Sequence, residues 1–423
     1  MTAIILFASF IILIFLSVPI GISLGIATLI TIVVSETLPL SFLPQALINA
    51  VDNFPIMAVP FFILAGRLWG RGGLSQRLFA VANAIVGNKT GGIAIAAIIT
   101  SMFFSAMSGS APATVAAVGG LMIPAMIQEG YDRKFATAVI VSAGSLGIFP
   151  PSIPMVVYGV SGGVSIGDLF IAGILPGFLV AFALMVYAFW YSKKMGYKGS
   201  GEEVGLKVFG KAAWEAKWGL LVPVIILGGI YGGVFTPTEA AVVAVVYGFF
   251  AGVFLYKQLK IKDIPSVISD AALTTATILI IVGAATAFGG LMTVEQMPQQ
   301  IAAGILSISE NPIIVILLIT VLLLIVGCFM DTLAAIIILT PLLLPIAVSI
   351  GFDPVHFGII MVINLAIGFI TPPVGVNLFV GSGISGLSIE AIAKAVVPFF
   401  FAMLISLIVV IFIPQISLLL VPE

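Results

Sequence analysis

The chain has 423 residues, of which 61% are hydrophobic and 8% are charged. Soluble globular proteins carry about 25% charged residues, so this composition excludes a soluble enzyme, a secreted module, a disordered protein and a nucleic-acid binder. A single cysteine also excludes a disulfide framework and a cysteine-based zinc site. The class that remains is an all-α polytopic membrane protein.

Ten apolar segments have the length expected of membrane crossings, because a helix needs about 20 apolar residues to cross the hydrocarbon layer. The predicted crossings are residues 2–18, 20–34, 54–70, 133–160 and 168–192, followed by 217–234, 238–256, 272–291, 353–382 and 390–419. The first basic residue is Arg67, so the opening apolar run is interpreted as a crossing and not as a removable signal peptide.

Two further apolar stretches, 88–128 and 311–348, are too long for one crossing and are interrupted by small or polar residues. They predict re-entrant hairpins that enter and leave the membrane on the same side. The less apolar segments 71–87 and 292–310 precede the hairpins and are predicted to be interfacial helices.

The basic residues support this crossing count. If the linker 193–216 is cytoplasmic, all 16 lysines and arginines fall on the cytoplasmic side, as the positive-inside rule expects. Both termini are then predicted to be extracytoplasmic.

The two halves of the chain resemble each other at an offset of about 221 residues, which predicts repeats at 1–192 and 217–423. The matched pairs are Pro124 with Pro345, Gly130 with Gly351, Asp132 with Asp353, Gly147 with Gly368, Pro150-Pro151 with Pro372-Pro373, Gly159 with Gly381, and Pro176 with Pro398. Five crossings per half would place the copies in opposite orientations, a pattern typical of secondary transporters. The alternative is that glycine and proline, common in membrane helices, match by chance.

Each half contains two breaks, one at its hairpin tip and one at a double proline. The breaks read SAMSGSAPAT (105–114) and GIFPPS (147–152), then GCFMDT (327–332) and GFITPPVGVN (368–377). Proline and glycine free backbone carbonyls there, and these suit Na⁺ together with hydroxyl groups. Helix N-termini starting at the same breaks favour an anion.

We therefore predict two Na⁺ sites and an anion site, with no other cofactor. The first Na⁺ site would use Ser105, Ser108 and Ser110 with carbonyls around Gly147 and Pro150. The second would use carbonyls around Gly327 and Cys328 with Asp331, Thr332, Gly368 and Thr371. The predicted substrate-binding residues are Ser108, Pro151, Ser152, Asp331, Pro372 and Asn377.

Structural roles are open for several of these residues. The serines could be small packing residues, Asp331 an N-cap, and Asn377 a residue that joins helices. Glu239 is interpreted as part of a capping box that starts at Thr236.

An intramembrane hydrolase is the enzyme alternative, with Ser108 or Ser110 as nucleophile and His356 as base. The predicted topology puts His356 on the opposite edge of the membrane from the first hairpin. No Walker motif is present, which argues against direct ATP driving.

Several stretches together resemble a known family. They are FTPTEAAVVAVVYG, SGSAPATVAAVG, PAMIQEGYDRKFATAV, GIFPPSIPMVVYG, GCFMDTLAAIIILTPLLLPI and GFITPPVGVNLFV. The chain resembles the large membrane subunit of the tripartite ATP-independent periplasmic (TRAP) transporters. The resemblance implies an elevator-type fold of the ion-transporter superfamily in a bacterial inner membrane, with both termini in the periplasm.

The same resemblance implies Na⁺-coupled uptake of an organic acid of the sialic acid or C4-dicarboxylate type. It implies two partners, a periplasmic substrate-binding protein and a small four-helix membrane subunit, and it places ions and substrate at the two tips and two double-proline breaks. A stand-alone Na⁺/dicarboxylate symporter or exchanger of similar inverted-repeat fold is the alternative.

Overall fold

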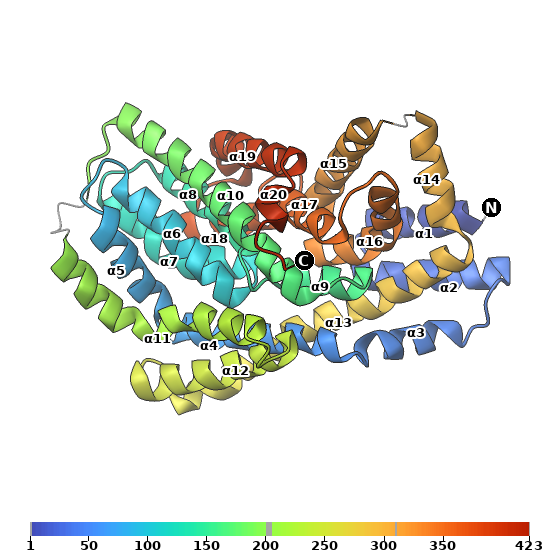
Figure 1. The fold of residues 1–423 in the computed structure, drawn as a ribbon, viewed down its shortest axis with the longest axis horizontal. Coiled ribbons are helices and arrows are strands. Elements are labelled where there is room, and N and C mark those ends of the chain that lie inside the picture. Colours follow the sequence, from blue (N-terminus) through green and yellow to red (C-terminus); the bar gives the residue numbers. More distant parts are fainter. Residues whose placement is uncertain (1, 200–204, 309–310, 423) are drawn as a thin grey trace.

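The computed structural model describes residues 2–199, 205–308 and 311–422, and this part of the chain is helical throughout, without a strand (Figure 1). The helices of the first half are α1 (Thr2–Phe15), α2 (Ile20–Ser35), α3 (Phe42–Val51), η1 (Phe54–Met57), α4 (Ala58–Arg71), α5 (Leu74–Val86), α6 (Gly92–Ser108), α7 (Ala111–Gln128), α8 (Arg133–Gly144), η2 (Ser145–Ile148), α9 (Ile153–Gly162) and α10 (Ile166–Met195).

The helices of the second half are α11 (Leu206–Tyr231), α12 (Pro237–Phe250), η3 (Ala251–Leu255), η4 (Ile261–Asp263), α13 (Ile264–Val294), α14 (Met297–Ile308), α15 (Pro312–Phe329), α16 (Thr332–Ser349), α17 (Pro354–Gly368), α18 (Val376–Ser385), α19 (Ile389–Phe412) and α20 (Gln415–Leu418). Each range predicted as a crossing is occupied mainly by helix. The predicted interfacial segments correspond to α5 and α14, although residues 309 and 310 lie outside the described part.

Two features differ from the sequence-based expectation. Helix α3 lies between the predicted crossings 20–34 and 54–70, where no helix is predicted; it packs along α13 and is bent by 59° from the helical segment 54–71. Its sequence has a polar face with Gln45 and Asn49 four residues apart, so it does not have the pattern of a crossing. Helices α10 and α11 also extend into the predicted linker 193–216, of which residues 200–204 lie outside the described part.

Nine helices of the described part are long and apolar enough to span a membrane, or ten if α3 with the 54–71 segment counts as one bent span. Three of them, α7, α15 and α16, are arms of the predicted hairpins. Helices α1 and α2 are shorter, with 14 and 16 residues. The protein is therefore an all-α, multi-pass membrane protein, and the arrangement of ten crossings with two re-entrant hairpins stays a prediction.

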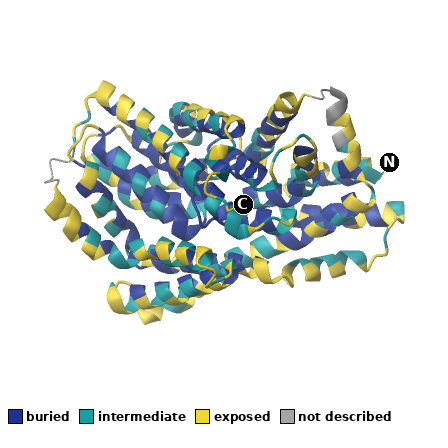
Figure 2. Ribbon diagram, in the orientation of Figure 1, coloured by how far each residue is buried: buried dark blue, intermediate teal, exposed yellow. Residues whose placement is uncertain are grey.

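The broken helices occupy the centre of the molecule. In the most apolar 18-residue segment of Arg133–Gly162, 94% of the residues are buried inside the protein. In the corresponding segments of α15 and α11, 33% and 22% of the residues are buried. Figure 2 shows the same contrast, with buried residues through the middle and exposed residues on the outer helices. The outer helices therefore offer the apolar surface that a bilayer covers.

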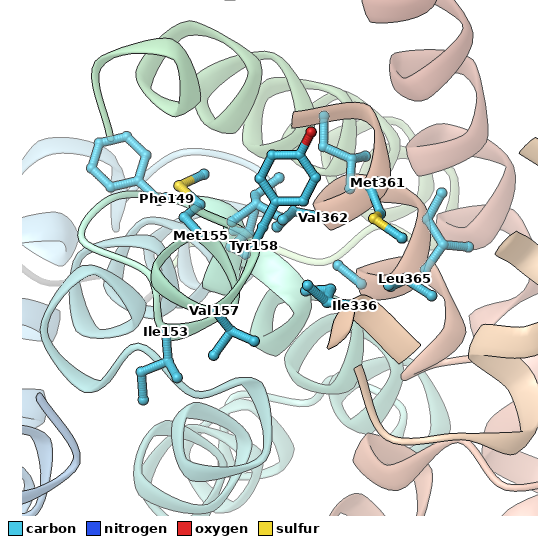
Figure 3. Close-up of a cluster of buried hydrophobic side chains, with 14 of the residues drawn as sticks. Phe149, Ile153, Met155, Val157, Tyr158, Ile336, Met361, Val362 and Leu365 are labelled. Atoms are coloured by element: carbon cyan, nitrogen blue, oxygen red, sulfur yellow. The ribbon is translucent and has the colours of Figure 1, made fainter. Parts of the chain in front are cut away.

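The two halves meet in this buried centre. Phe149, Met155 and Tyr158 of the first half gather with Met361 and other side chains of α17 (Figure 3). The Tyr158 hydroxyl donates a hydrogen bond to the Pro354 carbonyl at 2.7 Å, which gives this polar tip a partner inside the core.

Residues paired by the sequence repeat have the same local roles. Asp132 accepts hydrogen bonds from two backbone N–H groups at the start of α8, at 3.0 and 3.1 Å. Asp353 does the same at the start of α17, at 2.8 and 3.0 Å. Gly130 and Gly351, which precede these caps, both have positive φ, of 84° and 92°. These matches support the repeat, while its inverted orientation stays a prediction.

The predicted capping box at the start of α12 is confirmed. The Glu239 backbone N–H donates to Thr236 Oγ1 at 3.2 Å, and the Thr236 backbone N–H donates to Glu239 Oε2 at 2.8 Å. Glu239 therefore has a structural role.

Candidate functional site

Both hairpin tips line one cavity of about 900 Å³. The first tip contributes residues from Ser108 to Ala113, and the second contributes residues from Asp331 to Leu333. Helices η2, α9 and α17 line other parts of the cavity, together with α4 and α13. Arg67 and Arg71 are exposed lining residues, so the cavity reaches the surface of the protein.

The first tip holds a cluster of hydroxyl groups. Thr114 Oγ1 lies 3.1 Å from Ser105 Oγ and 3.0 Å from Ser108 Oγ, and it donates to the Ser110 carbonyl at 2.9 Å. Ser108 and Ser110 line the cavity, whereas Ser105 and Thr114 lie just behind them and are fully buried. An oxygen-only cluster of this kind suits a hard cation.

Two helix N-termini open into the cavity beside this cluster. Helix α7 follows Ser110, and helix α9 follows Ser152; neither serine side chain makes a capping hydrogen bond. The first residues of both helices, including Pro112 and Pro154, line the cavity. Unoccupied N–H groups and the positive end of the helix dipole make such starts suitable for an anion.

The second tip is charged. Asp331 lines the cavity, and its Oδ2 accepts a hydrogen bond from the Leu333 backbone N–H at 2.9 Å. The N-cap role considered for Asp331 is therefore confirmed, and the same residue lines the cavity beside Thr332. A carboxylate in the wall of such a cavity attracts a cation.

The other residues predicted for the second Na⁺ site gather beside this tip without lining the cavity. Gly327 and Gly368 are in direct backbone contact, since a Cβ added to Gly368 would lie 2.7 Å from Gly327 Cα. The Cys328 carbonyl accepts a hydrogen bond from the Val374 N–H at 3.1 Å. Thr371 Oγ1 donates to the Ile367 carbonyl at 2.8 Å. The end of α15 and the break after α17 therefore form one packed unit.

Comparison with known proteins identifies the chain. The family described as "Tripartite ATP-independent periplasmic transporter, DctM component" matches residues 7–416. The chain belongs to this family. It is thus a large membrane subunit of a TRAP transporter, and the resemblance seen in the sequence motifs is confirmed.

Two relatives and one solved structure show how close the similarity is. The chain is 51% identical to the "Isethionate TRAP transporter permease protein DctMQ" of Oleidesulfovibrio alaskensis, covering 98% of this chain and 65% of that protein. It is 42% identical to the "C4-dicarboxylate TRAP transporter large permease protein DctM" of Pseudomonas aeruginosa, covering 94% and 93%. The crystal structure of the Alcanivorax borkumensis YdaH transporter matches with a TM-score of 0.68 at 15% identity, over 90% of each chain, which shows a shared fold.

The hydrolase alternative fails on this result, because a TRAP large subunit is a transporter component and not an enzyme. The residues that such a hydrolase would need also lie in different parts of the structure. His356 is buried in α17 and stacks on Phe352, with ring centroids 5.8 Å apart, whereas Ser108 and Ser110 line the cavity and His356 does not.

The remaining predicted substrate residues of this TRAP subunit lie outside the cavity lining. The Asn377 amide group donates to the Val141 carbonyl at 3.1 Å and to Ser145 Oγ at 3.2 Å, so it joins α18 to α8 and η2. Ser145 itself lines the cavity, which places Asn377 one residue behind it. The bonds Pro150–Pro151 and Pro372–Pro373 are both cis, and Ser152 is buried. A direct substrate role for these residues stays a prediction.

Four residues at or behind the cavity wall were not predicted from the sequence. Thr114 stands in the motif of the first tip, and its hydroxyl four residues after Ser110 was the available signal. Ser145, Arg67 and Thr274 reach the cavity only through long-range packing, and no spacing in the sequence links them to the tips.

Proposed function

We propose that this TRAP subunit carries the translocation pathway for Na⁺-coupled uptake of an organic acid anion. One observation supports this most directly. A single cavity combines two uncapped helix N-termini, a hydroxyl cluster and a carboxylate. The first group suits an anion, and the other two suit Na⁺.

The anion would bind near the starts of α7 and α9. Backbone N–H groups there can donate to a carboxylate or a sulfonate without the cost of burying a second charged side chain. Ser108, predicted from the sequence to bind substrate, and Ser110 line the cavity beside these starts and would add hydroxyl donors.

Two Na⁺ sites would flank the anion. The first would use the hydroxyl cluster of Ser105, Ser108, Ser110 and Thr114, with carbonyls near Gly147 and Pro150. The second would use Asp331 and Thr332 with the packed unit of Gly327, Cys328, Gly368 and Thr371. Bound Na⁺ would then reduce the electrostatic cost of holding an anion in the same cavity, and this mutual stabilisation is the coupling.

Movement would follow the elevator scheme. The hairpins α6–α7 and α15–α16, with the broken helices α8–α9 and α17–α18, would move together as one packed unit. Helices such as α4, α12 and α13 would form the scaffold. Contact between the parts is tight, since a Cβ added to Gly66 of α4 would lie 2.7 Å from Ser108 Cα at the first tip.

The similarity to the relatives narrows the range of anions that we propose as cargo. The isethionate and C4-dicarboxylate relatives suggest a small anion that ends in a sulfonate or a carboxylate. We place isethionate first because that relative shares 51% identity, then C4-dicarboxylates, and then sialic acids. A periplasmic binding protein would deliver the anion, and a small four-helix membrane subunit would complete the transporter in the bacterial inner membrane, with both termini of this chain in the periplasm.

Uptake of labelled isethionate, succinate and sialic acid by the reconstituted complex tests the proposal. Each anion would be presented on its binding protein, with a Na⁺ gradient or with K⁺ in its place. Uptake that requires both Na⁺ and the binding protein is expected. Equal uptake in K⁺ would contradict Na⁺ coupling, and uptake of free anion without a binding protein would favour the stand-alone symporter.

A further inference from the structure

Arg67 of α4 is a basic residue in the cavity wall that the Na⁺ and anion sites do not use. Its side chain is exposed, lines the cavity, and donates from Nη2 to Thr274 Oγ1 of α13 at 3.2 Å. Arg71, one turn further along α4, also lines the cavity but is paired with Asp270, with 2.7 Å between Nη2 and Oδ2. Across the described residues this is the one salt bridge within 4.0 Å, so Arg67 has a hydroxyl partner and no carboxylate partner.

Arg67 also lies close to the first tip. The residue before it, Gly66, packs against the tip so closely that an added Cβ would lie 2.7 Å from Ser108 Cα. Arg67 and Ser108 line the same cavity. The backbone of Arg67 therefore lies next to the point where α4 contacts the first tip, and its guanidinium group is held by Thr274 in the wall of the same cavity.

The charges that line the cavity leave Arg67 without a counter-charge once Na⁺ binds. Arg71 is neutralised by Asp270, and the remaining charged lining residues in the described part of the chain are Arg67 and Asp331. Na⁺ beside Asp331 would neutralise that carboxylate. The field of Arg67 would then attract an anion into the cavity, because narrow clefts with low-dielectric walls focus such fields.

We infer that Arg67, on the predicted cytoplasmic side, guides the organic anion at the mouth of the cavity by pairing transiently with its carboxylate or sulfonate as the anion passes between the helix starts and the cytoplasmic solution. The inference rests on the proposed function, since it assumes that the cargo is an anion. A planar guanidinium suits the geometry of these groups, and its exposure keeps the pairing weak enough for rapid exchange.

Anion-dependent thermal stabilisation of the detergent-solubilised transporter complex measures this role without requiring transport. The probes are isethionate and succinate, titrated at fixed Na⁺ concentration, with sialic acid added for the wild-type complex, and ionic strength is varied with choline chloride. Arg67→Gln should weaken the apparent affinity about fivefold at low ionic strength, with a larger loss for divalent succinate than for monovalent isethionate. Arg67→Lys should keep most of the affinity. High ionic strength should reduce the difference between wild type and Arg67→Gln, because exposed charges are screened.

The matched control is Arg71→Gln combined with Asp270→Asn. It removes a neighbouring arginine from the same cavity wall without changing the net charge, and it should keep the wild-type affinity within about twofold. Arg67→His provides a second test within one folded protein, since a histidine side chain with a pKa of about 6.5 loses its charge as pH rises. Its affinity relative to wild type should be higher at pH 5.5 than at pH 8.

Affinities of Arg67→Gln and Arg67→His that match wild type for both anions, at low ionic strength and at every pH, would overturn the inference. A different outcome identifies failure of the proposed function. If neither isethionate, succinate nor sialic acid stabilises the wild-type complex in Na⁺, the anion site itself is wrong, and the role of Arg67 is wrong with it.

Discussion

The two hairpin tips occupy corresponding places in the repeat and share one cavity, but their chemistry differs. At the first tip, Ser110 leaves the start of α7 without a side-chain cap, and the nearby oxygens belong to neutral hydroxyl groups. At the second tip, Asp331 caps α16 with a carboxylate. The first tip therefore presents a helix start without a side-chain cap, and the second presents a carboxyl group.

The paired glycines of the two broken helices also differ, in how closely each is packed. Gly147 and Gly368 are paired by the repeat, yet a Cβ on Gly147 would meet its nearest neighbour, Ala111 N, at 3.5 Å. A Cβ on Gly368 would collide with the carbonyl group of Gly327. The two halves thus place their breaks close together, but Gly368 is packed directly against backbone whereas Gly147 has space around it.

The largest expected effect comes from Gly368→Ala compared with Gly147→Ala. The backbone of Gly327 cannot move as a side chain would, so Gly368→Ala should destabilise the protein by about 1–3 kcal/mol and weaken Na⁺-dependent stabilisation. Gly147→Ala should behave nearly as wild type, because its closest contact is an ordinary van der Waals distance. Thermal unfolding with and without Na⁺ measures both. Equal effects of the two substitutions would show that the breaks are equivalent after all.

Asp331→Asn separates charge from capping at the second tip. Asparagine also caps helices well, so the melting temperature without Na⁺ should stay close to wild type, while the Na⁺ affinity should fall at least about tenfold. Asp331→Ala should lose the Na⁺ affinity and, in addition, about 1 kcal/mol of stability. A Na⁺ titration of thermal stability reports both quantities. Wild-type Na⁺ affinity in Asp331→Asn would remove Asp331 from the cation site.

Thr114→Val tests the first tip with a side chain of nearly the same shape. The hydroxyl lost is the common partner of Ser105 and Ser108, so we expect a stability loss of about 1 kcal/mol and a several-fold weaker Na⁺ affinity. Thr320→Val is the matched control, because this buried hydroxyl bonds only to the Ile316 carbonyl of its own helix in the described structure. If both variants change the Na⁺ affinity equally, the hydroxyl cluster is a packing feature.

The smallest expected effect is that of Glu239→Ala, because Glu239 has a capping role in α12 and no proposed role at either tip. Loss of one half of the capping box should cost about 0.5–1 kcal/mol and leave the Na⁺ and anion affinities unchanged. Thermal unfolding and the two ligand titrations on the same preparation check this. A changed Na⁺ affinity in this variant would mean that general destabilisation, and not site chemistry, governs the titrations above.

Local rules explain how much of this structure could be predicted from the sequence. The apolar lengths located the helices, the capping box at Thr236 predicted its own hydrogen bonds, and glycine, serine and proline marked the breaks. Helix α3 was not predicted because it is short and has a polar face, so its sequence contains no long apolar run.

The assembled site depends on packing between distant segments, which no local pattern encodes. Arg67 and Asp331 line one cavity although 264 positions separate them in the sequence. Asn377 was predicted at the substrate, which stays a prediction; its amide group donates hydrogen bonds to Val141 and Ser145, because the turn after α17 places α18 against α8. The residue types of the site were therefore accessible from the sequence, and their distances from the cavity were not.

The most direct test is a cross-titration of the solubilised complex, measuring anion affinity at rising Na⁺ and Na⁺ affinity at rising anion. If one cavity holds both ligands, each ligand should strengthen the other by the same factor, K⁺ should not replace Na⁺, and the mutual effect should be reduced in Asp331→Asn. Anion affinity that is independent of Na⁺, or equal in K⁺, would contradict the claim that one cavity holds both ligands.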